Sequence, residues 1–268
     1  MNLANTASKK NRALLAELVR TDFKLRYQGS VLGYAWSLLR PLLLFAILYV
    51  VFVQFLRLGE GVPHFPVYLL LGIVIWNFFH EMTVQSLTSI VGRGDLIRKI
   101  RIPRWIIIVS SSISALINLM LNMLVVIFFM AVSGVELMNT SLLLLPILIE
   151  VYIFALGLSL LLSAAYVKYR DVNYIWEVIL QAGFYITPIL YPLSLITNIT
   201  LQKLIMLNPM AQTIQAARYS SVTHETITGY QIFDGGWYLY IPYIIVAVTF
   251  ISGLFYFKTQ AKFFAENI

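Results

Sequence analysis

The chain has 268 residues, of which 60% are hydrophobic and 12% are charged, and its formal net charge is +7. About a quarter of the residues are charged in soluble domains, so this composition excludes an ordinary soluble protein and predicts an all-α integral membrane protein. There is no cysteine, which excludes disulfides and thiolate metal sites, and the three histidines have no ligand spacing. We interpret the basic excess as cytoplasmic loops facing anionic lipid, with no nucleic acid as a partner.

Residues 1–30 predict a cytoplasmic segment with an amphipathic helix over residues 11–28. Its apolar and basic side chains occupy opposite halves of a helical wheel, as in helices that lie in the membrane interface. Asp22 and Arg26 interrupt the apolar half at i,i+4 spacing, where they are able to pair. Two interpretations stay open: a local ion pair at the lipid surface, or a contact with another protein element near the cytoplasm.

Residues 31–257 predict a domain of six transmembrane helices, and residues 258–268 a cytoplasmic tail. The predicted spans cover about residues 33–55, 67–87, 105–132, 142–167, 174–187 and 237–257. With both termini in the cytoplasm, most lysines and arginines fall on the cytoplasmic side, and only Arg57, Lys203 and Arg218 lie outside. This bias supports the topology, because basic loops stay inside.

Between the second and third spans, residues 92–104 predict a short basic helix. Gly92 and Gly94 loosen its start, where Asp95 is favoured by the helix dipole, and Pro103 stops it. Its apolar side chains are Leu96, Ile97 and Ile100, and Arg98 and Arg101 fall on the other side. One interpretation is a solvated loop that follows the positive-inside rule. The other is a docking element that passes force to the membrane domain.

Several polar side chains lie inside the predicted spans. Asn77, His80 and Glu81 make the inner half of the second span unusually polar. Asn118 and Asn122 of the third span have the i,i+4 spacing of residues that join helices by hydrogen bonds.

Glu150 lies near the middle of the fourth span, about ten residues from its start at about 1.5 Å per residue. An acid at this depth is a functional candidate by default. It would equally serve to hold two helices together, and one acid alone does not make a proton relay.

After the fifth span the apolar sequence is interrupted by prolines. Pro188, Pro192 and Pro209 divide it into pieces too short to cross a hydrocarbon core of about 30 Å. Irregular backbone at membrane depth must be buried in protein or line a cavity. We therefore predict re-entrant or interfacial helices over residues 188–220, with a loop on the lipid surface as the alternative.

The chain contains no motif of a stand-alone enzyme. It has no Gly-x-x-x-x-Gly-Lys-Ser/Thr loop for nucleotide phosphates, no His-Glu-x-x-His and no Gly-x-Ser-x-Gly. We therefore predict no catalytic residue, no metal site and no cofactor on this chain. A secondary transporter would show repeated halves with matched broken helices, and no such repeat is visible. Two classes remain: a transport subunit that takes its energy from another protein, or a structural membrane protein.

Several motifs in order along the chain carry a family resemblance. They are Asp22-Phe-Lys-x-Arg26-Tyr27, Ser30, Leu32-Gly33, Trp36, Pro41, Asp95-Leu-Ile-Arg-Lys-Ile-Arg-Ile-Pro103, Tyr169-Arg-Asp171, Thr187-Pro188-Ile-x-Tyr191-Pro192 and Leu207-Asn208-Pro209. With these motifs the chain resembles the membrane subunits of type-2 ABC exporters for lipid-linked polysaccharides. Bacterial O-antigen, capsule and wall teichoic acid exporters form the closest group.

The resemblance implies a homodimer in the bacterial plasma (inner) membrane, bound to two copies of a separate ATPase that holds ATP and Mg²⁺. The helix of residues 95–102 would be the coupling helix seated in the ATPase, with Asp95, Leu96, Ile97, Arg98, Lys99, Ile100 and Arg101 at the contact. The interface helix would contribute Asp22, Phe23, Lys24, Arg26 and Tyr27. Pro188, Pro192 and Pro209 would mark two external gate helices.

The substrate path would begin at a basic inner mouth, where Lys24, Arg26 and Arg40 are candidates to meet a lipid diphosphate. Aromatic candidates to contact sugars are Tyr34, Trp36, Phe184, Tyr185 and Tyr191. Aromatic residues are also typical of membrane interfaces, which is the alternative for each of them. The alternative functions are a drug, peptide or small-lipid exporter of the same superfamily, and a membrane scaffold that transports nothing.

Overall fold

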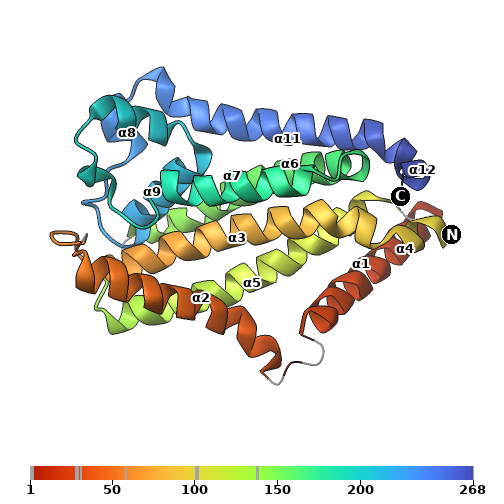
Figure 1. Cartoon of the computed structure of the whole chain (residues 1–268), viewed down its shortest axis with the longest axis horizontal. Helices are drawn as coiled ribbons and strands as arrows, with labels where there is room; N and C mark the ends of the chain where they lie inside the picture. The colour runs from red at the N-terminus through yellow and green to blue at the C-terminus, as the bar shows by residue number, and fades with distance from the viewer. Residues whose placement is uncertain are drawn as a thin grey trace.

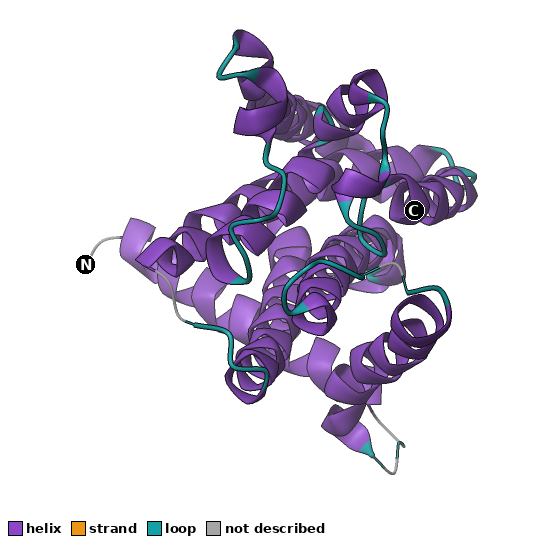
Figure 2. Cartoon of the chain, turned by 90° about the vertical axis from the view of Figure 1, so that its left-hand side faces the viewer, coloured by secondary structure: helices purple, strands orange, loops and turns teal. Residues whose placement is uncertain are grey.

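The computed structural model describes residues 3–27, 30, 32–57, 59–99, 103–136 and 139–267. In these ranges the chain forms helices and loops and no strand (Figure 2). The long helices run side by side along one axis (Figure 1). We name the two ends of this bundle by the short helices found there. At the α4 end lie α4 (Gly94–Lys99), α12 (Phe264–Asn267) and the first turns of α1 (Leu3–Tyr27), and at the α9 end lies α9 (Pro209–Ser221).

Five helical segments among the described residues are long and apolar enough to cross a membrane. They are α2 with η2 (Trp36–Leu48, Tyr49–Phe55), α3 (Phe65–Gly92), α5 (Trp105–Val132), η3 with α6 (Asn139–Leu143, Leu144–Lys168), and η5, α11 and η6 (Trp237–Tyr240, Ile241–Gln260, Ala261–Phe263). They coincide with the first four predicted spans and the last one. The short η1 (Gly33–Ala35) precedes α2.

The predicted fifth span corresponds to α7 (Val172–Ile186), which has only 15 residues. At about 1.5 Å per residue it rises about 22 Å, less than the thickness of the hydrocarbon core. The helix ends because Thr187 is extended and Pro188 follows. The structure therefore gives five candidate spans, and the count of six stays a prediction.

The core is built around α3, which packs against α5 on one side and α6 on another. Helix α3 is apolar over most of its circumference, as is typical of a buried helix, and most of it is covered by protein. Its aromatic side chains make ring contacts, among them Phe79 stacked on Phe154 of α6 with centroids 5.5 Å apart.

Helices α6 and α11 cross at a pair of glycines. A Cβ atom on Gly253 would lie 2.2 Å from the carbonyl oxygen of Gly157, and a Cβ on Gly157 would meet the backbone of Phe250 at 2.6 Å. Small residues at such crossings let two backbones approach closely, which is how membrane helices gain packing energy.

The α9 end is made of short helices joined by loops. They are η4 (Leu193–Leu195), α8 (Ile199–Met206), α9 and α10 (Gly229–Phe233). The side chains of Asn198 and Asn208 accept hydrogen bonds from the first backbone N–H groups of α8 and α9, and Pro209 occupies the first turn. Most of α9 is buried against α3, α6 and α11. The region 188–220 therefore contains short helices, of which α9 is covered by protein and is not a lipid-surface loop, whereas most of α8 is exposed. Their re-entrant placement stays a prediction.

Candidate functional site

Helix α4 presents two charged side chains outward and is anchored by one apolar side chain. Asp95 lies in its first turn, as predicted, and Asp95 and Arg98 are exposed. Ile97 is 9% exposed and packs in a cluster with Ile107 of α5 and Phe264 of α12. Leu96 is half-buried. The side chain of Lys99, and residues 100–102 with Ile100 and Arg101, lie outside the described part of the chain.

Arg93, directly before α4, joins three helices. Its guanidinium pairs with the carboxylate of Asp22 on α1. The Nη1 atom donates to Ser110 Oγ at 3.0 Å and to the carbonyl oxygen of Ile107 at 3.4 Å, both on α5. About a fifth of each paired side chain remains exposed, so the pair is partly screened by water. Movement of α4 is thereby linked to α1 and α5.

This pairing supports one of the two interpretations of Asp22. Its carboxylate contacts Arg93, 71 residues away, so Asp22 meets another element of the protein, and the predicted pair with Arg26 lies outside the described side chains. Lys24 is exposed. The side chains of Phe23, Arg26 and Tyr27 lie outside what the structure describes. Helix α1 extends over residues 3–27, which is longer than predicted, and packs along α5.

At the opposite end of the bundle, Arg218 of α9 is fully buried. Its guanidinium stacks on the ring of Tyr68 of α3, 3.7 Å from the centroid, and Nε donates to the carbonyl oxygen of Tyr68 at 2.9 Å. Nη1 donates to Pro188 O at 2.5 Å and Nη2 to Ile189 O at 2.7 Å. Burial lowers the pKa of Arg218 and contact with Tyr68 opposes this shift, but an arginine stays protonated in proteins.

Two further contacts hold the segment after α7. The side chain of Asn208 donates to Thr187 Oγ1 at 3.3 Å, and the hydroxyl of Tyr191 donates to the carbonyl oxygen of Ile186 at 3.1 Å. Pro188 and Pro192 are buried. The three predicted gate prolines, with Pro209 at the start of α9, therefore belong to one packed unit centred on Arg218.

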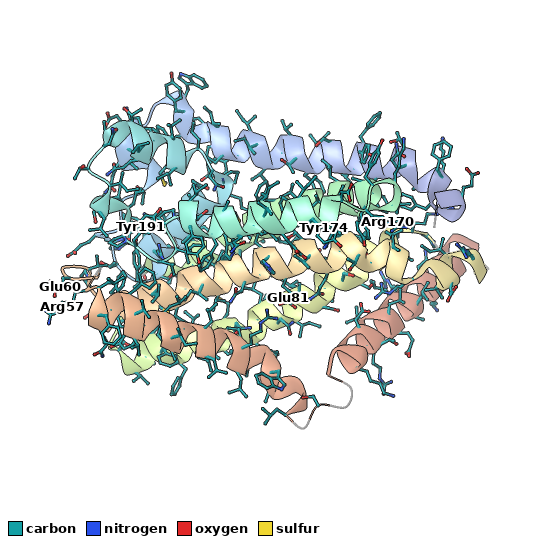
Figure 3. All side chains as sticks on the ribbon, in the orientation of Figure 1. Arg57, Glu60, Glu81, Arg170, Tyr174 and Tyr191 are labelled. Atoms are coloured by element: carbon teal, nitrogen blue, oxygen red, sulfur yellow. The ribbon has the colours of Figure 1, made fainter. Side chains whose placement is uncertain are left out.

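The predicted path residues form two groups rather than one. Trp36 and Arg40 are exposed at the start of α2. Phe184 and Tyr185 lie at the end of α7, where Tyr185 is 62% exposed and Phe184 packs on Trp76 of α3. Tyr191 follows them (Figure 3). The side chain of Tyr34 lies outside the described residues.

Between these groups, α3 presents polar side chains about halfway along its length, where Figure 3 labels Glu81. Glu81 accepts hydrogen bonds from the amides of Gln85 and of Asn118 on α5. Asn122 bonds to the carbonyl oxygens of Asn118 and of Ser37 on α2. The asparagines thus join helices, as predicted, and Asn118 also positions an acid.

Glu150 borders a different surface. It lines an apolar groove of about 410 Å³ between α6 and α11, together with Ile153, Tyr243 and Phe250. Its Oε1 atom is buried and has no hydrogen-bond partner among the described residues. The hydroxyl of Tyr243 accepts a hydrogen bond from Gln212 of α9 at 2.7 Å. Glu150 therefore shows no ion pair that would join helices within the part of the chain that is described.

Comparison with known proteins gives the family. Residues 13–222 match the family described as ABC-2 type transporter. The chain belongs to the ABC-2 type transporter family. A Klebsiella pneumoniae protein named "O-antigen export system permease protein RfbA" is 30% identical over 254 residues, 94% of both chains. A protein of the same name from Myxococcus xanthus is 31% identical over 216 residues, 80% of this chain and 81% of that one.

Membership in the ABC-2 family confirms the resemblance and makes the chain the membrane part of a transporter. The family also implies an ATPase partner. The sequence did not point to Arg93 and Arg218 as organising residues, because each was counted only as a charge in the topology. Their partners lie far away in the sequence or are backbone carbonyls, so no local pattern marked them.

Proposed function

We propose that this chain is the membrane subunit of an ATP-driven exporter that moves a lipid-linked polysaccharide of O-antigen type out of a bacterial cytoplasm across the plasma membrane. The observation that carries the proposal is the 30% identity to a relative named as an O-antigen export permease, along 94% of both chains. A match of this extent leaves little room for a different membrane domain. It favours polysaccharide over drugs, peptides or small lipids, and a transporter over a scaffold.

The working unit is a homodimer, in which α7 is the fifth of six spans and residues 187–195 complete its outer part. Helix α2 supports this assembly, because only 6% of the residues in its most apolar stretch are buried within the chain. Helix α7 also has an exposed face, on which the side chains of Tyr174, Val178 and Ile186 are each more than half exposed. A second copy would cover part of these surfaces and leave a path between the two chains.

Two copies of the ATPase, which hold ATP and Mg²⁺, dock on the two α4 helices at the cytoplasmic side. The exposed Asp95 and Arg98 suit this contact, since α4 itself is fixed by Ile97 from behind. When the ATPases close, the motion passes through Arg93 and Asp22 to α1 and α5. The buried unit around Arg218 moves with α3, so the path opens between the copies rather than within one chain.

A charge reversal at Arg98 tests this function. The Arg98→Glu variant keeps Ile97 in its cluster, and we expect normal membrane insertion with loss of the co-purified ATPase and of surface polysaccharide. Ile97→Asp is a poor test, because it would bury a carboxylate in the apolar cluster. Lys258→Glu is the matched control, since Lys258 is exposed at the same end on α11.

Full ATPase binding and export by Arg98→Glu would contradict the coupling role. A wild-type chain that purifies with no ATPase, in detergent mild enough to keep the dimer, would contradict the transport function and favour the scaffold.

A further inference from the structure

One face of α3 is polar although the rest of the helix is buried in the core. Asn77 and Glu81 are partly exposed, His80 and Thr88 are exposed, and Gln85 is partly exposed. Spacings of three and four residues place these side chains on one side of the helix. We call these five residues the polar face of α3.

The polar face is bordered by charged groups from both neighbouring helices. Helices α2 and α7 both pack against α3. On α7, Trp176 donates to Thr83 of α3 at 3.1 Å, and the next residue, Glu177, is exposed and accepts a hydrogen bond from Asn173 at 3.0 Å. On α2, Arg40 is exposed, so three packed helices carry ionisable side chains in this part of the bundle.

Beside this face, Glu81 of α3 accepts a hydrogen bond from the side-chain amide of Asn118 on α5. The Oδ1 atom of Asn118 is buried without a hydrogen-bond partner among the described residues, and its amide group is held on Glu81. Asn118 itself is 3% exposed. Asn118 is therefore too deeply buried to meet a substrate itself, and its role is to hold Glu81 at the polar face.

Lipid tails cannot cover this face, because polar and charged groups in hydrocarbon are costly and are found facing water-filled cavities or protein. If the path runs between α2 and α7, as the proposed function requires, its wall there holds two carboxylates and one guanidinium. Carboxylates accept hydrogen bonds from hydroxyl groups but repel phosphates and acidic sugars at close range in a site of low dielectric constant.

We propose that the polar face of α3, with Arg40 and Glu177, contacts the hydroxyl groups of an uncharged glycan during export and disfavours polymers that carry a phosphate or carboxylate in each repeat unit. This inference rests on the proposed function, because it assigns the substrate class of the same path. It makes the chain selective for uncharged polymers rather than for a teichoic acid.

The experiment uses the whole exporter, permease and ATPase, in cells that assemble one of two polymers on the same carrier lipid. One polymer has repeat units with hydroxyl groups only, and the other has a phosphodiester in each unit. Surface polymer is measured per permease molecule. We expect the wild type to export the neutral polymer at least about tenfold better, as repulsion at short range implies.

The decisive variant is Glu177→Gln, which removes one negative charge and keeps the size of the side chain. It should raise the ratio of anionic to neutral export about threefold or more. Glu225→Gln is the matched control, because Glu225 is an exposed acid in the loop after α9, and its ratio should equal that of the wild type.

Equal export of both polymers by the wild type, or an unchanged ratio in Glu177→Gln, would overturn the selectivity. Loss of the dimer in Glu177→Gln would also overturn it and show that a second copy covers this face. Failure to export either polymer with the ATPase present would instead contradict the proposed function itself.

Discussion

The two ends of the bundle use arginine in different ways. At the α4 end, Arg93 forms an ion pair with Asp22 that water still reaches. At the α9 end, Arg218 is buried completely and bonds to neutral groups, the carbonyl oxygens of Tyr68, Pro188 and Ile189. A partly exposed pair is weak and exchanges easily, whereas a buried charge with all its donors engaged is costly to disturb. The comparison teaches that the α4 end is suited to transmit motion and the α9 end to resist it.

The largest effect should come from removing the guanidinium at the α9 end. Arg218→Met leaves two carbonyl oxygens buried without donors, and we expect a loss of about 3–5 kcal/mol of unfolding free energy. Thermal unfolding of the purified protein in detergent measures it. The stability of Arg218→Lys should lie between those of the wild type and Arg218→Met, because an ammonium group cannot reach all three carbonyl oxygens and Gln215 Oε1, which also accepts from Nη1 at 3.2 Å. An Arg218→Met variant as stable as the wild type would contradict the idea that the α9 end depends more strongly on its arginine than the α4 end does.

A smaller effect should follow from crowding the same guanidinium. A Cβ on Gly72 would lie 2.5 Å from Arg218 Nη2, so Gly72→Ala should destabilise by about 1–3 kcal/mol through overpacking. Gly92→Ala is the control, since a Cβ there meets open space, and it should change stability by less than about 1 kcal/mol. Similar melting temperatures for both variants would show that the guanidinium of Arg218 shifts at little cost to make room for the added methyl group.

The smallest effect should be at the α4 end. Asp22→Asn and Arg93→Gln should each cost about 1 kcal/mol, with a coupling free energy of about 0.5–1 kcal/mol in a double-mutant cycle. Glu17→Gln, at an exposed position on α1, should be neutral. The cycle is measured by thermal unfolding, and limited proteolysis of α1 reports the local effect. A coupling energy near zero would mean that the pair does not link the helices.

The sequence was sufficient for the parts that depend on local patterns. Long apolar runs predicted the five candidate spans, and α4 begins at Gly94, one residue before the predicted start at Asp95. The prolines after α7 predicted short helices, because a proline is tolerated in the first turn of a helix but disfavours the helical conformation in the residue before it. The length of α7 marks the limit: the predicted span 174–187 ends within one residue of the helix, yet hydropathy did not show that a helix of 15 residues is too short to cross a membrane alone.

Long-range partners could not be predicted. Arg218 was assigned to the external charges, yet it is bonded to carbonyl groups 29 to 150 residues away, and a carbonyl has no sequence signature. Asp22 had a local candidate partner in Arg26, and its contact with Arg93 follows from the packing of α1 on α5, which no local pattern predicts. Ile97 was placed on an apolar side, but its anchoring role depends on Phe264 at the far end of the chain.

The central claim is that the segment after α7 stays fixed to α9 while the exporter works. The chain has no cysteine, so Thr187→Cys with Asn208→Cys introduces one defined thiol pair, at side chains that are 3.3 Å apart in the hydrogen bond they share. These thiols are joined by oxidation or by a short reducible cross-linker in cells that express the whole exporter. We predict that joined and reduced protein export surface polysaccharide at the same rate. Loss of export on joining, restored by reductant, would contradict the account and place the moving gate inside each chain.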